Sequence, residues 1–166
     1  EQFGMRQAID RFVGMFVFAI WDRQERELTL VRDRLGIKPL YWAQFGGLFL
    51  FGSELKALRS SPGWQPELNR DALAAYMRWN YVPAPLTIYR GVSKLEPGCI
   101  LRVPSSGTVH IERYWDPVDV VERGIAHRNE LEDEECIEGL REKLGQAVRQ
   151  RMISDVPLGV FLSGGI

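Results

Sequence analysis

The chain has 166 residues, of which 45% are hydrophobic and 26% are charged, a composition typical of a globular protein with a buried core and not of a disordered tail. The formal net charge of -1 and the pI near 6.2 leave no broad cationic surface, which excludes nucleic acid and anionic membranes as expected partners. No apolar run reaches the roughly 18 residues that cross a bilayer, and the N-terminal residues lack a secretory signal, so a cytoplasmic protein is expected.

Two hairpins are predicted in the first third of the chain. The apolar run 15–21 favours a central strand with both faces buried, and residues 27–32 are close enough to pair with it in antiparallel fashion. Residues 40–43 and 48–51 flank a pair of glycines at 46–47, which supply the positive φ of a tight turn. These patterns indicate an antiparallel sheet.

Three helices are predicted from capping residues and apolar spacing. One covers about residues 2–11, and a short one follows Ser53, which is the expected N-cap. Asn69 is the cap expected for the third helix, residues 70–79, whose packed side is predicted to consist of Leu73, Tyr76 and Met77.

The second half of the chain predicts a hairpin, a connection and the start of another domain. Residues 99–103 and 109–115 form the expected hairpin, and the apolar pattern lapses over residues 117–132, which suits an interdomain connection. A helix of about 20 residues is expected from near Asp133, and the acidic residues 130 and 132–135 are expected to be its solvated start. Residues 156–162 are expected to form a buried strand that leads into a small-residue turn.

Six motifs occur in order along the chain: GMFVFAIWD, RDRLGIKPLY, GSELKAL, LEPGCILRV, YWDP and VPLGVFLSGGI. In this order and spacing they resemble class II glutamine amidotransferases, and among these the glutamine-hydrolysing asparagine synthetases. Each motif alone is moderately specific, whereas their ordered combination is highly specific and spans nearly the whole chain.

The resemblance implies an α+β fold in three parts. Residues 1–116 are expected to be the C-terminal part of an Ntn-type glutaminase sheet sandwich with antiparallel strands and flanking helices. Residues 117–132 are the expected linker. Residues 133–166 are the expected start of an α/β ATP-pyrophosphatase (synthetase) domain, with its first helix and strand. Both ends of the chain are expected to be fragment boundaries.

The closing Ser-Gly-Gly is the candidate nucleotide site. An isolated Ser-Gly-Gly is usually only a tight turn, but small residues after a parallel strand let a phosphate approach main-chain N–H groups. The resemblance is to the SGGxDS pyrophosphate loop of ATP pyrophosphatases, and the chain stops at Ile166, before the expected Asp and Ser. The residues that we expect to bind ATP are Leu162, Ser163, Gly164 and Gly165.

No catalytic residue and no metal ligand is assigned. The family uses an N-terminal cysteine as nucleophile, whereas this chain starts with Glu1 and its two cysteines, Cys99 and Cys136, are internal. The cysteines lack metal-ligand spacing and are expected to be reduced. Neither His110 nor His127 has an acidic residue and a nucleophile at a spacing that would indicate a catalytic arrangement. The chain by itself is therefore expected not to hydrolyse glutamine.

The charged turn within RDRLGIKPLY has two interpretations. Arg32, Asp33, Arg34 and Lys38 surround Gly36 between apolar segments, which favours a structural ion-pair turn over part of a domain interface. The resemblance also implies an apolar passage for ammonia between the two sites, with candidate walls at Met15, Ile37 and Leu162.

The resemblance implies a parent enzyme that converts aspartate, glutamine and ATP to asparagine, glutamate, AMP and pyrophosphate and requires Mg²⁺. The small-molecule partners would be glutamine, aspartate and ATP, and a half-covered helix and an unpaired sheet edge make a homodimer a candidate assembly. Two alternatives remain. One is a related amidotransferase that acts on another carboxylate in surface-sugar or peptide biosynthesis, and the other is a noncatalytic scaffold that retains the fold.

Overall fold

A computed structural model describes residues 4–127, 131–161 and 164 of the chain. Two compact units are present, Glu1–Val120 and Val121–Ile166. Among the described helices, none combines the length and the apolar character that a membrane span requires.

The first sheet of the N-terminal unit has four antiparallel strands in the order β1-β2-β6-β7. The strands are β1 (Val17–Asp22), β2 (Glu27–Arg32), β6 (Cys99–Val103) and β7 (His110–Arg113). Both predicted hairpins of this sheet, β1-β2 and β6-β7, are confirmed, and the central pair is β2 with β6, in which Leu30 lies opposite Leu101.

The second sheet has the order β4-β3-β5, also antiparallel, with β3 (Tyr41–Phe45), β4 (Leu48–Gly52) and β5 (Val92–Lys94). Gly46 and Gly47 form the β3-β4 turn with φ of 56° and 76°, so the predicted glycine hairpin is confirmed. The short strand β5 was not expected from the sequence.

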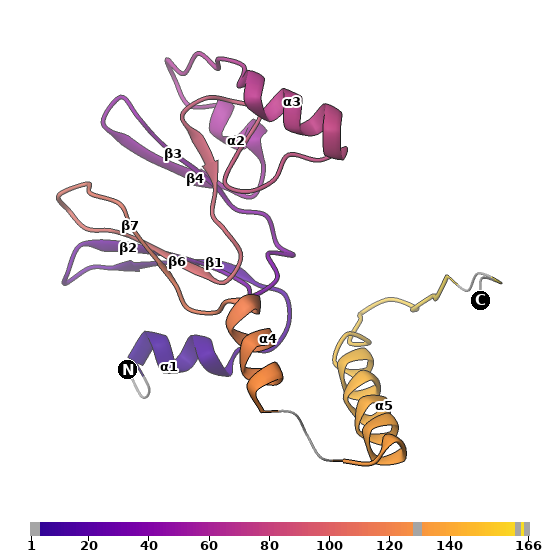
Figure 1. Cartoon of the computed structure of the whole chain (residues 1–166). Helices are drawn as coiled ribbons and strands as arrows, with labels where there is room; N and C mark the ends of the chain where they lie inside the picture. The colour runs from indigo at the N-terminus through magenta and orange to yellow at the C-terminus, as the bar shows by residue number, and fades with distance from the viewer. Residues whose placement is uncertain (1–3, 128–130, 162–163, 165–166) are drawn as a thin grey trace. The chain divides into compact units, whose positions relative to one another are not determined.

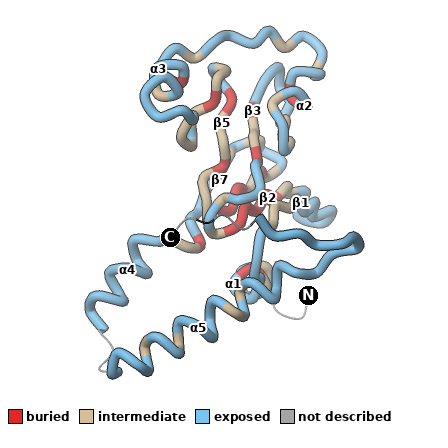
Figure 2. Tube along the Cα trace, turned by 90° about the vertical axis from the view of Figure 1, so that its right-hand side faces the viewer, coloured by how far each residue is buried: buried red, intermediate tan, exposed pale blue. Residues whose placement is uncertain are grey.

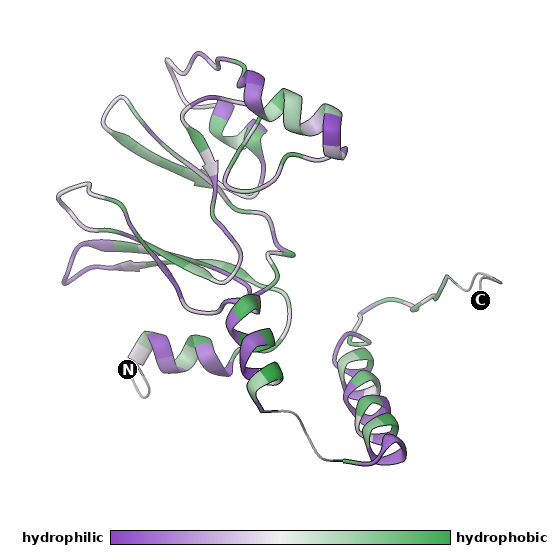
Figure 3. Ribbon diagram, viewed as in Figure 1, coloured by the Kyte–Doolittle hydropathy of each residue, from purple (hydrophilic) through white to green (hydrophobic). Residues whose placement is uncertain are grey.

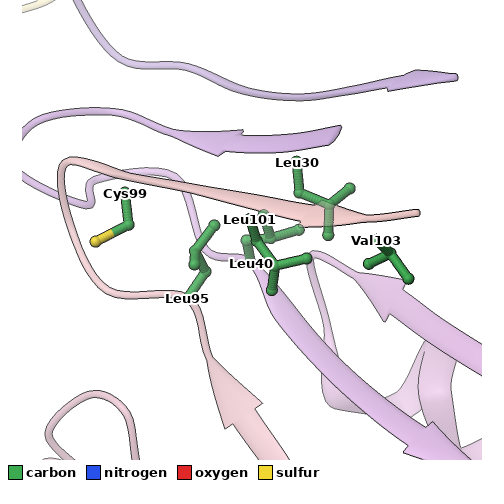
Figure 4. Packing of buried hydrophobic residues seen from close by; sticks show 6 residues of the cluster. All are labelled: Leu30, Leu40, Leu95, Cys99, Leu101 and Val103. Carbon is green, nitrogen blue, oxygen red and sulfur yellow. The ribbon is translucent and has the colours of Figure 1, made fainter. Parts of the chain in front are cut away.

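The two sheets and two helices of this unit form four layers (Figure 1). Apolar side chains from β2 and β6, together with the residues next to β3 and β5, form the cluster between the sheets (Figure 4): Leu30, Leu40, Leu95, Cys99, Leu101 and Val103. On the other face of the first sheet, Val31 and Ile100 pack against Ile9 of α1 (Gly4–Arg11). On the other face of the second sheet, Ala43 and Val92 pack against Leu58 of α2 (Leu55–Arg59). The order is therefore helix, sheet, sheet, helix.

Strand β1 corrects the expectation of a central, doubly buried strand. It is the edge strand of its sheet, and its residues 19–22 are exposed, with Trp21 at 55%. Only β2 pairs with it in the described part of the chain. Apolar residues on both faces of a strand indicate that both faces can be buried. They do not indicate whether the strand has a neighbour on each side in the sheet.

Helix α3 (Arg70–Trp79) is capped as predicted but packs through a different side. The Asn69 side chain accepts hydrogen bonds from the N–H groups of Asp71 and Ala72, at 3.1 and 3.3 Å. The buried residue is Ala72, whereas Leu73, Tyr76 and Met77 are exposed, so the predicted packed side was wrong. At α2 the N-cap is Glu54 and not Ser53, without a side-chain cap bond.

The expected connection between the domains contains a helix, α4 (Pro117–Ala126). Asp116 accepts a hydrogen bond at 2.8 Å from the N–H of Val118, and Pro117 occupies the first helical position, where its missing N–H costs nothing. The cap and the proline are the sequence signals for this helix, because charged residues and Gly124 interrupt its apolar pattern.

The C-terminal unit consists largely of α5 (Asp133–Arg149), whose predicted acidic start is confirmed by a capping box between Glu132 and Glu135. The expected strand 156–162 is not formed over residues 156–161, which are exposed and have no strand assignment (Figure 2). A strand needs a neighbour for its backbone groups, and no described residue pairs with this segment. Leu162 lies outside the described residues.

Candidate functional site

The turn after β2 is organised by the Arg32 side chain, which is 8% exposed. Its Nε donates a hydrogen bond to the carbonyl oxygen of Lys38 at 2.8 Å, and its guanidinium also donates to the carbonyls of Gly36, at 2.6 Å, and Leu95. Burial lowers the pKa of Arg32, and the nearby Asp33 opposes this shift. The cation is therefore bound by backbone oxygens from two separate segments.

The Asp33 side chain holds the opposite side of the same turn. Its carboxylate, 1% exposed, accepts hydrogen bonds from the N–H groups of Ile37 and Lys38, both at 3.0 Å. The Asp33 carbonyl accepts two more, from Gly36 and Gly98, also at 3.0 Å. The buried charge is thus satisfied by main-chain donors.

The predicted interpretation of this turn as structural is supported, but its chemistry differs from an ion pair. Arg32 and Asp33 each bind backbone groups, and no salt bridge involves either side chain among the described residues. Arg34 binds the carbonyls of Asp10 and Phe12 at the end of α1, at 2.8 and 2.5 Å. The outward side chains of the turn are Leu35 and Ile37, 67% and 49% exposed, together with Lys38.

Tyr114 and Lys94 belong to this arrangement and were not found from the sequence. The Tyr114 hydroxyl donates to the Arg32 carbonyl oxygen at 2.9 Å, and burial raises the pKa of Tyr114 to about 12. The Lys94 ammonium donates to the carbonyl of Val82, and burial, with the charge of Arg32, lowers the pKa of Lys94. Leu95 and Gly98, which bind the Arg32 turn from a distant segment, come from the turn that the sequence LEPG predicts.

Tyr114→Phe is expected to reduce the alkaline sensitivity of the fold. The folded pKa of about 12 lies above the roughly 10 of an unfolded tyrosine, so the stability due to the protonated hydroxyl is complete below pH 10 and is lost as the pH rises toward 12. Urea unfolding should show Tyr114→Phe about 1 kcal/mol less stable at pH 8, with the difference shrinking at higher pH. Tyr76→Phe, at an exposed position, is the control, and a constant difference across this pH range would contradict the assignment.

Most residues of the nucleotide site that the sequence predicts lie outside the described part of the chain. Leu162, Ser163 and Gly165 lie outside the described residues. Gly164 is exposed, has no secondary structure, and has no atom within 4 Å of the position that a Cβ would take. The expected phosphate-binding arrangement therefore remains a prediction.

The other titratable candidates do not assemble into a site. Cys99 is 1% exposed and burial raises the pKa of its thiol, which disfavours the nucleophilic thiolate. His110 is exposed on β7, and a ring nitrogen of His127 lies 3.1 Å from the Arg123 carbonyl oxygen. Within residues 4–127, 131–161 and 164, no group of three or more His, Cys, Asp or Glu side chains could hold a metal ion.

A cleft of about 190 Å³ opens where β1 and β2 approach the end of β4. It is lined by Val17, Phe18, Ala19, Leu30, Leu40, Phe51, Gly52 and Ser53. Ser53 is the only polar side chain in this lining, so the cleft offers apolar contact and one hydroxyl, without an acid, a base or a thiol.

The sequence motifs agree with comparisons to known proteins. Residues 1–115 match a family model described as a glutamine amidotransferase domain, and residues 139–166 match one described as asparagine synthase. The chain therefore belongs to the glutamine amidotransferase domain family.

Its relatives include named asparagine synthetases. The chain is 34% identical over 159 residues to asparagine synthetase [glutamine-hydrolyzing] 3 of Bacillus subtilis, covering 95% of this chain and 25% of the relative. It is 37% identical over 164 residues to a putative asparagine synthetase of Mycobacterium tuberculosis, covering 96% and 24%. It is also 34% identical over 162 residues to amidase chry2 of Gibberella zeae, covering 95% and 22%. The chain thus spans about a quarter of the length of these curated relatives.

Proposed function

We propose that this chain is part of a glutamine-dependent asparagine synthetase that acts in the cytoplasm. Residues 1–116 would be the C-terminal part of its Ntn-type glutaminase domain, residues 117–132 the connection, and residues 133–166 the start of its ATP-pyrophosphatase domain. The whole enzyme would transfer the amide nitrogen of glutamine to aspartate, with ATP cleaved to AMP and pyrophosphate.

The observation that carries the proposal is the order of the two family matches along one chain. An amidotransferase match over residues 1–115 is followed by an asparagine synthase match over residues 139–166. The helix-sheet-sheet-helix layering of the first unit supports an Ntn-type glutaminase fold. Relatives named as asparagine synthetases favour aspartate over another carboxylate as acceptor.

ATP would be held by the C-terminal loop, through the main-chain N–H groups of Ser163, Gly164 and Gly165, with Leu162 beside the nucleotide. Side chains of this size leave room for a phosphate at the backbone. The described residues contain no cluster of His, Cys, Asp or Glu side chains that fits Mg²⁺.

Ammonia would reach the second site through an apolar passage with Met15, Ile37 and Leu162 as wall residues. Met15 and Ile37 are 44% and 49% exposed in the first unit. The Asp33 carboxylate binds the N–H of Ile37 at 3.0 Å, so it would act as a positioning residue for this side chain.

The 166-residue chain by itself is expected to release no glutamate from glutamine above the uncatalysed rate. The nucleophile of acyl transfer in this family is an accessible thiolate with a base beside it, whereas the Cys99 thiol is buried with a raised pKa. A coupled glutamate dehydrogenase assay measures the product.

A longer protein from the same gene, assayed in parallel, is expected to form glutamate. Cys99→Ala in that protein should leave glutamate formation unchanged once the folded fraction is equalised. Glutamate release by the 166-residue chain that is abolished by Cys99→Ala or Cys136→Ala would contradict the proposal.

A further inference from the structure

The connection between α1 and β1 is an apolar segment without regular secondary structure. Phe12, Val13 and Met15 are 41%, 72% and 44% exposed, and none of residues 12–16 belongs to a helix or a strand. Figure 3 shows this connection as mostly hydrophobic, whereas α1 before it carries both hydrophilic and hydrophobic residues. The conformation of the connection therefore depends on the groups that bind its backbone.

Arg34, on the Arg32 turn, holds the first end of this connection. Its guanidinium donates hydrogen bonds to the carbonyl oxygens of Asp10 and Phe12, at 2.8 and 2.5 Å. These oxygens lie at the C-terminal end of α1, where the last carbonyls lack partners within the helix and the helix dipole favours a cation. A planar guanidinium donates to both oxygens at once, whereas the ammonium of a lysine lacks this fixed fork.

Asp33, the preceding residue, holds the second end of the connection and also positions Ile37. Its N–H donates a hydrogen bond to the Phe16 carbonyl oxygen at 2.9 Å, and its carboxylate accepts one from the N–H of Ile37 at 3.0 Å. Met15 therefore lies between two anchored residues, Phe12 and Phe16, whose rings pack edge to face with centroids 5.3 Å apart. Met15 and Ile37 are thus fixed to one turn by adjacent residues.

We propose that Arg34 is a positioning residue that sets the place of Met15 relative to Ile37 and thereby limits the escape of ammonia. The inference rests on the proposed function, in which these two side chains are walls of the ammonia passage. Without the guanidinium, the Phe12 carbonyl would lose this anchor, and Met15 would be tied to the turn only through Phe16. Arg34 would act through Met15, so its loss should impair the delivery of ammonia and not its release from glutamine.

Amide hydrogen exchange of the 166-residue chain tests the anchoring. Arg34→Met removes the donors, and it should accelerate exchange of the Phe12 amide, which binds the Ile9 carbonyl oxygen, about threefold or more. Arg34→Lys should give a smaller increase, because one ammonium replaces the fork. Arg23→Met, in the exposed turn between β1 and β2, is the matched control and should leave this amide unchanged.

The asparagine formed per glutamate tests the functional part, in a longer protein that contains this chain. With glutamine as nitrogen source, Arg34→Met should lower this ratio about threefold or more, while glutamate formation and asparagine formation from ammonium chloride stay within about twofold of the wild type. Arg34→Lys should fall between Arg34→Met and the wild type. The double variant Met15→Ala/Arg34→Met should lower the ratio no further than Met15→Ala alone, because Arg34 acts through Met15.

Four results would overturn the assignment of Arg34: an unchanged Phe12 exchange rate, an unchanged ratio in Arg34→Met, additive effects in the double variant, or a parallel loss of all three activities in both Arg34 variants. Failure of the proposed function has a different signature. A wild-type longer protein that forms no asparagine from either nitrogen source would refute that function, and this inference with it.

Discussion

Gly98→Ala is expected to lower the unfolding free energy of the chain by about 3 kcal/mol or more. Gly98 has φ of +64°, and a Cβ there would lie 2.2 Å from the carbonyl oxygen of Trp115, closer than atoms tolerate. Neither backbone segment is free to move. The Gly98 carbonyl accepts hydrogen bonds from the N–H of Tyr114 at 2.7 Å and of Trp115 at 3.2 Å, while its own N–H donates to Asp33. The methyl group would therefore break the link between β6, β7 and the Arg32 turn.

Gly107→Ala is the matched control for this prediction. Gly107 also has a positive φ, +80°, but nothing lies within 4 Å of its Cβ position, so only the cost of the left-handed conformation remains, about 1 kcal/mol. Urea unfolding followed by tryptophan fluorescence compares the two variants. Equal losses of stability at positions 98 and 107 would refute the predicted clash.

Asp33→Ala is expected to cost about 2 to 4 kcal/mol, because it removes a buried acceptor and leaves two main-chain donors without it. Those donors are the N–H groups of Ile37 and Lys38, each at 3.0 Å from the carboxylate. Amide hydrogen exchange should accelerate at Ile37 and Lys38 before it accelerates at the amides of the sheet. In a longer protein with synthetase activity, the less ordered Ile37 should also lower the yield of asparagine per glutamine hydrolysed.

Asp22→Ala is the control, because Asp22 also accepts hydrogen bonds from backbone N–H groups. Asp22 accepts from the N–H groups of Gln24 and Glu25, at 2.8 and 3.0 Å, but it does so in an exposed turn where water replaces the carboxylate. Its expected cost is below about 1 kcal/mol. The burial argument fails if the substitution at position 33 costs no more than the one at position 22.

Local signals in the sequence predicted much of the first unit. Strand β2 follows from its length and composition, the β3-β4 turn from its two glycines, and α3 from Asn69, because each signal acts within a few residues. Burial was harder to predict. The sequence could not show that β1 forms an edge or that Leu73 faces outward, because both depend on which elements are neighbours in space.

The interior of the Arg32 turn was beyond the sequence for the same reason. The four charged residues of the motif suggested ion pairs, whereas the observed partners of Arg32 include the carbonyl of Leu95, 63 residues away. The nucleotide loop remains a prediction, because three of its four residues lie outside the described part of the chain.

Transfer of nitrogen from glutamine to aspartate tests the central claim most directly. The measurement uses glutamine labelled with ¹⁵N at its amide, aspartate and ATP, with a longer protein that contains this chain. We predict that ¹⁵N appears in the side-chain amide of asparagine, with one AMP and one pyrophosphate formed per asparagine. Label that appears in another amide, or ATP cleaved to ADP, would contradict the assignment.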